Sequence, residues 1–152
     1  MLSRDQLAQL LNEDLARGYQ AIISYVIYPQ VLKGAEYMNI ANQLELHAKR
    51  ELDPALILSM QIDYLGAMSI ARPKTVKTPE KPKEMLRSDL SNETIRNYPE
   101  RVQQCEQLGE YAVAEQIPQI LVDERDHQID LATALGEEVP ALEAPKAKRA
   151  AK

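Results

Sequence analysis

Apolar side chains recur along most of this chain at intervals of three and four residues, which is the spacing of one face of an α-helix. The pattern predicts four helices, over residues 3–31, 35–65, 82–108 and 110–136. Ser3 is the expected N-cap of the first helix, and Gly136 is the expected C-cap of the last. The three connections are short, long and short in turn. That order is typical of a four-helix bundle with one long crossover between its second and third helices.

Two segments interrupt the helical pattern. Residues 71–83, ARPKTVKTPEKPK, hold three prolines and five cationic side chains, and we expect them to form a solvated connection. Residues 137–152 are rich in Ala, Lys and Pro, and we expect this tail to be disordered. The sequence therefore predicts one helical domain, residues 1–136, followed by the tail.

Composition supports an all-α fold and narrows the choice of function. The 152 residues suffice for one domain, and they include no Phe or Trp and only 5 Gly. The net charge of −5 argues against a nucleic-acid-binding protein, which normally carries a basic face. No apolar run approaches the roughly 18 residues of a membrane-spanning helix, so no membrane partner is expected. The single cysteine, Cys105, indicates a reducing compartment, so a cytoplasmic protein is expected.

The predicted fourth helix carries a carboxylate and an imidazole on its apolar face. Glu124 and His127 are three residues apart and continue the apolar spacing of Ile120 and Leu131. A buried carboxylate without a partner costs several kcal/mol, so it must be paired, protonated or bound to a metal ion. A Glu-x-x-His pair that projects into a helical bundle is one way to hold iron or manganese. The alternative is a solvated Glu and His on a charged face.

Two other predicted helices also direct a carboxylate inward. Glu51 takes the place of an apolar residue between Ala48 and Ala55, and Glu93 follows the apolar Leu90 at helical spacing. For either residue alone, the alternative is an ordinary surface glutamate. Three inward carboxylates and one imidazole, from three helices, favour a metal site. Hard oxygen donors with one imidazole suit iron or manganese better than a structural zinc ion, which prefers thiolates.

Three stretches, LNEDLARGYQAIISY, EMLRSDL and ILVDERDHQIDLATALG, resemble the bacterioferritin branch of the ferritin-like superfamily. The likeness covers about residues 11–136. It implies a ferritin-like four-helix bundle and a ferroxidase centre, with a Glu from helices one and three and a Glu-x-x-His pair from helices two and four. Glu51, Glu93, Glu124 and His127 match that pattern, although the chain between Glu93 and Glu124 is shorter than is usual in the family.

Two positions depart from the family pattern. Gly18 stands where the resemblance implies the first-helix Glu, and Pro54 stands where it implies the second-helix His. In the family both ligands serve the same iron, so the resemblance implies one remaining metal position per chain and weak or absent ferroxidase activity. Tyr25 matches a tyrosine that the family keeps near its metals. Asp123, four residues before His127, is a candidate to orient the imidazole, with a surface role as the alternative.

The resemblance also bears on haem and on assembly. The family binds haem through a Met directly after the second-helix Glu, but that residue is Leu52 here, so no haem is expected. His47 lies one turn before Glu51, and we expect it to have a hydrogen-bonded structural role rather than to bind the metal. Members of the family pair through their first two helices, which implies a homodimer or a larger homo-oligomer.

The sequence therefore predicts a cytoplasmic ferritin-like protein that binds one iron or manganese ion per chain. Its relatives by this resemblance oxidise and store iron. Two alternatives stay open. One is a metal-free bundle with a structural or partner-binding role, and the other is a still-active di-iron ferroxidase. The metal content of the purified protein distinguishes the three.

Overall fold

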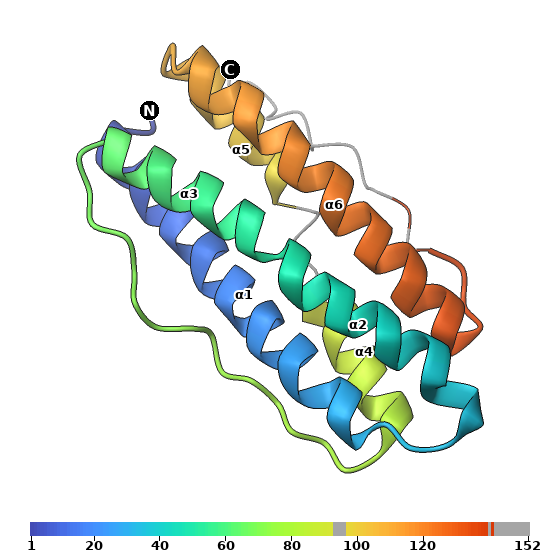
Figure 1. Cartoon of the computed structure of the whole chain (residues 1–152). Coiled ribbons are helices and arrows are strands. Elements are labelled where there is room, and N and C mark those ends of the chain that lie inside the picture. The colour runs from blue at the N-terminus through green and yellow to red at the C-terminus, as the bar shows by residue number, and fades with distance from the viewer. Residues whose placement is uncertain (93–96, 140, 142–152) are drawn as a thin grey trace.

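The computed structural model describes residues 1–92, 97–139 and 141, and its regular elements are all helices in this part of the chain. They form four columns: α1, then α2 with α3, then α4 with α5, and finally α6 (Figure 1). The second and third columns run in the same direction, so the link between them must travel the length of the bundle. The predicted four-helix bundle with one long crossover is confirmed. The elements are α1 (Arg4–Val31), the 3-10 helix η1 (Ala35–Tyr37), α2 (Met38–Arg50), α3 (Leu52–Tyr64), α4 (Pro82–Asn92), α5 (Tyr98–Gln107) and α6 (Tyr111–Leu135).

The outer ends of the first and last helices are those that the sequence predicts. The Ser3 hydroxyl accepts a hydrogen bond from the backbone N–H of Gln6, at 3.1 Å. The Gln6 side chain accepts one from the backbone N–H of Ser3, at 2.8 Å, which completes a capping box. At the far end, α6 stops at Gly136, whose φ of 68° is left-handed and favours glycine.

The second column is not the single helix that the apolar spacing predicts. It is interrupted at Glu51, where α2 ends and α3 begins, and Pro54 lies in the first turn of α3. A proline is tolerated there because the first N–H groups of a helix have no partner within it. The break is slight, since the N–H of Glu51 still donates to the carbonyl of His47, at 2.9 Å.

The third column is divided as well, into α4 and α5. Residues 93–96 lie outside the part of the chain that the structure describes. Pro99 occupies the second position of α5, where a proline fits without the loss of a hydrogen bond. Pro118 lies on the exposed face of α6, and that helix continues through it.

The long crossover, residues 65–81, is held against α1 rather than left loose in solvent (Figure 1). Asn12 hydrogen-bonds to the backbone of Met68 and Ile70, at 3.0 and 2.7 Å. Gln20 donates to the carbonyl of Thr75, at 2.7 Å, and further bonds join Ala16 to Lys74 and Tyr28 to Lys77. The α1 partners are four or eight residues apart, so one face of α1 fixes the path of the crossover.

A buried ion pair joins α1 to α5. Arg101 donates two hydrogen bonds to the Asp14 carboxylate, at 2.8 and 3.4 Å, and both side chains are almost fully buried. Burial raises the pKa of the Asp14 carboxyl, and the Arg101 guanidinium partly opposes that shift. Removing one member of such a pair generally costs about 3–5 kcal/mol, because the other charge is left buried alone. The pair therefore ties the register of α5 to that of α1.

The apolar core consists of two clusters, one in each half of the bundle. The first fills the half that contains α3 and α5, and the second fills the half that contains α2 and α4. Among the described residues, no helix is both long and apolar enough to cross a membrane. The largest fully buried side chains of the two clusters are Leu7, Leu11, Leu15, Leu58, Ile62, Ile117 and Ile120 in the first, and Tyr25, Tyr28, Leu44 and Leu86 in the second.

Candidate metal centre

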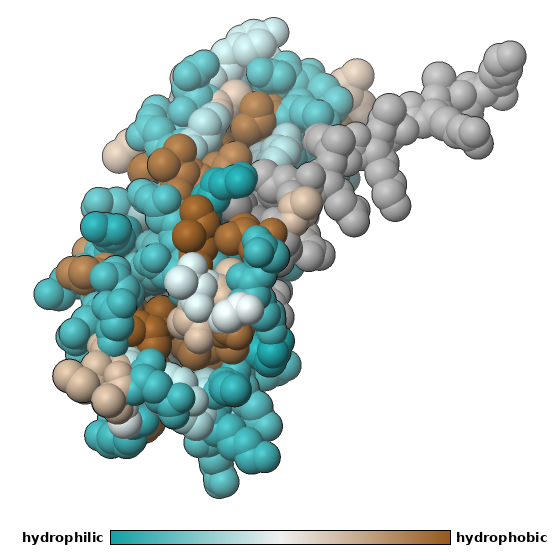
Figure 2. All heavy atoms as spheres, turned by 90° about the vertical axis from the view of Figure 1, so that its right-hand side faces the viewer, coloured by the Kyte–Doolittle hydropathy of each residue, from teal (hydrophilic) through white to brown (hydrophobic). Residues whose placement is uncertain are grey.

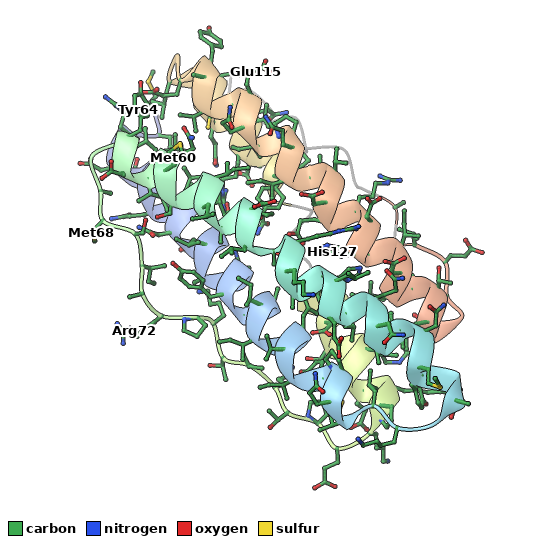
Figure 3. The ribbon with its side chains drawn as sticks, in the orientation of Figure 1. Met60, Tyr64, Met68, Arg72, Glu115 and His127 are labelled. Carbon is green, nitrogen blue, oxygen red and sulfur yellow. The ribbon has the colours of Figure 1, made fainter. Side chains whose placement is uncertain are left out.

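Three of the predicted ligand side chains meet inside the bundle. Glu51 comes from the junction of α2 and α3, and Glu124 and His127 come from α6. Each offers one ligand atom, and these atoms all lie within 4.8 Å of one another. The residues are only 1%, 5% and 0% exposed. Figure 3 places His127 between α2 and α6, midway along the bundle. These three side chains therefore do not form a solvated charged face.

Local structure explains why the three residues point inward. The spacing of three residues in α6 places Glu124 and His127 on the face that also buries Ile120 and Leu131. Those two apolar residues belong to different core clusters, so the polar side chains lie where the clusters meet. Glu51 enters the same layer from the second column, and its Oε1 is 2.8 Å from Nδ1 of His127.

The His127 ring is uncharged near neutral pH. Burial lowers its pKa to about 4, and the charge of nearby Asp123 only partly opposes this shift. Metal ions bind the neutral imidazole, so the ring is already in the protonation state that a ligand needs. In the described structure, Nδ1–H of His127 donates to the Glu51 carboxylate, and a metal ion between the two would take the place of that proton.

The donor set fits an iron or manganese ion. Carboxylate oxygens and one imidazole nitrogen are the donors that these metals accept, and the thiolates of structural zinc sites are absent from the cluster. Bonds to such ligands are about 2.0–2.2 Å long, so ligand atoms on opposite sides of an ion lie roughly 4–4.4 Å apart. The ligand atoms here all lie within 4.8 Å of one another, so at most small side-chain rotations are needed to surround an ion.

The structure places the other predicted site residues as follows. The Tyr25 ring is edge-on to the His127 ring, with 5.8 Å between centroids, so Tyr25 does lie beside the cluster. Asp123 is half-buried and acts on His127 through its charge, and no hydrogen bond joins the two in the part of the chain described. Glu93 lies outside the described residues.

Gly18 and Pro54, where the family resemblance implies ligands that this chain lacks, are both at least half-buried. Pro54 is buried in the first turn of α3. Gly18 is half-buried in α1, and a Cβ atom built on it would meet nothing within 4 Å. Neither residue carries a side-chain atom that can bind a metal.

One neighbour of the site was only partly expected. His47 is fully buried, and its Nε2 donates to the Asp130 carboxylate, at 2.8 Å, as a hydrogen-bonded structural role requires. Its ring also stacks on that of His127, with 3.9 Å between centroids and 21° between planes, which sequence reasoning missed. The signal was present, since His47 and Glu51 are four residues apart and share one helix face. Burial, with the His127 ring beside it, lowers the pKa of His47 to about 4.

The chain is similar to a known protein family and to several of its members. The ferritin-like domain matches residues 8–138. A bacterioferritin of Brucella melitensis biotype 1 is 24% identical over 147 residues, covering 91% of each chain. A ferritin-like diiron-carboxylate protein of Bacillus anthracis strain Ames is 30% identical, with a TM-score of 0.82 over 88% of this chain and 99% of that one. A dodecameric thioferritin of Bacteroides fragilis is 24% identical, with a TM-score of 0.78 over 89% and 87% of the two chains. The chain therefore belongs to the ferritin-like domain family.

Proposed function

We propose that the protein binds one iron or manganese ion per chain, and that its ferroxidase activity is weak or absent. The observation that carries the proposal is the convergence of Glu51, Glu124 and His127 in a buried cluster. Glu93, which the sequence assigns to the third predicted helix, is the fourth ligand in this proposal. Buried carboxylates are stable when they are paired, protonated or bound to a metal ion, and a divalent cation would balance the charge of both carboxylates in this cluster.

The loss of activity follows from the side chains at two positions. In the proposed scheme Gly18 and Pro54 stand where a second iron would find its terminal ligands, and neither has a donor atom. A pair of iron(II) ions can pass two electrons to dioxygen, whereas one ion can pass only one. The similar Bacillus anthracis protein is a diiron-carboxylate protein, which supports iron as the metal. Leu52 has no ligand atom, so the proposal includes no haem.

The first prediction concerns metal content. Anaerobic loading with iron(II), followed by elemental analysis, should give about one tightly bound metal ion per chain, because only one set of ligands is complete. His127→Ala and Glu124→Gln should each remove most of this metal, since each deletes a donor from the cluster. Glu115→Gln, a similar change on the exposed face of the same helix, is the matched control and should retain it (Figure 3).

Two results of that experiment would contradict the proposal in different ways. Two tightly held iron ions per chain would show a working di-iron centre. No metal under any loading condition would favour the remaining alternative, a metal-free bundle with a structural or partner-binding role.

We also propose that the protein forms a homodimer or a larger homo-oligomer through the face that includes α3. Leu52, Leu56, Met60 and Tyr64 repeat every four residues on α3, and each is more than half exposed. Figure 3 shows Met60 and Tyr64 on the outer side of this helix. An exposed apolar stripe of this length is unusual for a monomer and marks an interface. The similar Bacteroides fragilis protein is a dodecamer, which supports assembly.

The side of the bundle that includes α6 is a suitable control surface. Figure 2 shows the right-hand side of Figure 1, along which α6 runs, and hydrophilic and hydrophobic side chains are mixed on it. Its exposed large apolar residues on α6 are widely spaced: Tyr111, Val122 and Ile129. They form no continuous stripe comparable with that of α3.

The second prediction tests this interface. The double variant Leu56→Lys, Met60→Lys should shift the protein toward the monomer, because two charges would be placed in the apolar contact. Val122→Lys, at a similarly exposed apolar position of α6, should leave the assembly unchanged. Light scattering at micromolar concentration measures both. A monomeric unmodified protein, or equal effects of the two changes, would contradict the proposed interface.

A further inference from the structure

Three rings from three helix columns pack together beside the proposed metal ligands. They belong to Tyr25 of α1, His47 of α2 and His127 of α6, and we call them the ring cluster. His47 lies face to face with His127, at 3.9 Å between centroids. Tyr25 presents an edge to both imidazoles, at 5.5 and 5.8 Å. All three residues are at most 1% exposed, so each ring is confined by its neighbours.

The orientation of the His47 ring is itself fixed by a hydrogen bond to α6. Its Nε2–H donates to Oδ2 of Asp130, at 2.8 Å, and Asp130 is three residues after His127 on α6. Two side-chain hydrogen bonds therefore link the second column to α6. One joins His47 to Asp130, and the other joins Glu51 to His127. The Asp130 bond fixes the rotation of the His47 ring, and with it the surface on which His127 stacks.

Nε2, the ring nitrogen of His127 that does not bond to Glu51, lacks the hydrogen bond that a metal-binding imidazole usually makes. A metal-binding His almost always donates its second N–H to a carboxylate or a backbone carbonyl, which sets the direction of the ring. Nε2 of His127 is buried and has no hydrogen-bond partner in the described part of the chain. The torsion that turns an imidazole is broad, so without such a bond the ring could swing away from Glu51. Packing against neighbouring side chains must therefore hold the His127 ring in its orientation.

We propose that His47, held by Asp130, is a positioning residue that fixes the plane of the His127 ring for metal binding by stacking on it. This inference rests on the proposed metal site. His47 contributes a flat, rigid surface in this role. Its Nε2 anchors that surface to Asp130, and its Nδ1 has no hydrogen-bond partner in the described part of the chain. The role is therefore distinct from that of a ligand, and a flat ring without nitrogen should perform most of it.

Cobalt(II) is a suitable probe, because its visible absorption responds to the geometry of its ligands and its titration gives an affinity. Against the unmodified protein, His47→Ala should weaken cobalt binding about tenfold or more, within the roughly 10–100-fold range typical of outer partners of metal ligands. It should also change the visible spectrum. His47→Phe keeps a flat ring and should restore both the affinity, to within about threefold, and the spectrum.

A pair of aspartate variants keeps the test informative if the core substitutions fold poorly. Asp130→Ala leaves the His47 ring in place but removes its anchor, as His47→Phe does, so cobalt affinity should fall by about threefold, much less than in His47→Ala. Asp126→Ala is the matched control, because it removes the same charge from an exposed position one residue before His127 and does not contact His47 in the described structure. It should leave the affinity nearly unchanged. Thermal unfolding of the metal-free variants reports folding separately.

The outcomes separate this inference from the function on which it rests. If the unmodified protein binds cobalt, and His47→Ala does so with the same affinity and spectrum, the positioning role is wrong while the metal site stands. If His47→Phe is as weak as His47→Ala, the nitrogen rather than the ring is required, and the role is again wrong. If the unmodified protein binds no cobalt, the proposed metal site fails, and this inference fails with it.

Discussion

The double variant Gly18→Glu, Pro54→His should bind two iron ions per chain and oxidise iron(II) with dioxygen far faster than the native protein. The two changes return a carboxylate and an imidazole to the positions where the proposed second iron lacks ligands. Position 54 is buried within the bundle, and a side chain at position 18 starts in open space. Stopped-flow absorbance during aerobic addition of iron(II) measures the rate.

The gain should require both changes. One ligand alone leaves the second position incomplete, so each single variant should stay close to the native rate, and the two effects should be strongly non-additive. We expect the double variant to exceed either single variant by a factor on the order of 100, since loss of even an outer partner of a ligand costs roughly 10–100-fold. Gly18→Gln combined with Pro54→His is the matched control, because glutamine has the size of glutamate without its charge.

Stability gives an independent check on the same variant. Gly18→Glu should stabilise α1 by several tenths of a kcal/mol through helix propensity. Pro54→His should change stability little, because Pro54 lies in the first turn of α3, where its missing N–H is not needed. A double variant that is folded and of normal stability, yet holds no second iron, would show that Gly18 and Pro54 are not lost ligand positions.

The metal-free protein should lose much of its stability between pH 6.5 and pH 4. His47 and His127 have pKa values of about 4 in the folded state, because burial disfavours their charged forms. In the unfolded chain an imidazole has a pKa of about 6.5. Between these values the unfolded state binds more protons than the folded state, so the free energy of unfolding falls as the pH falls.

The loss should be on the order of a few kcal/mol, since one pKa unit corresponds to about 1.4 kcal/mol. That is a large part of the roughly 5–15 kcal/mol that stabilises a typical domain. Urea unfolding at several pH values measures it. A variant with His47→Gln and His127→Gln should show a flatter dependence over this range, because it has no imidazole to protonate. Equal losses in the native protein and the variant would mean that other groups cause the acid sensitivity.

The pattern of residues was enough to predict the class of fold and three residues of the buried cluster that could hold a metal ion. Helix periodicity is local, so it identifies which side chains share a face, and the three inward side chains of the cluster were predicted in this way. Caps are local as well, which is why the ends at Ser3 and Gly136 were predicted correctly. Periodicity could not reveal the interruption at Glu51, because apolar spacing continues across it.

The amino-acid sequence by itself determined the helical segments, the inward carboxylates and the absence of donor atoms at Gly18 and Pro54, because each is a property of one residue and its near neighbours. Only the tertiary structure decided what these groups meet. His47 contacts Asp130, and Arg101 contacts Asp14, across separations of 83 and 87 residues. No spacing rule predicts such pairs, because they depend on the rotation and register of whole helices packed against one another.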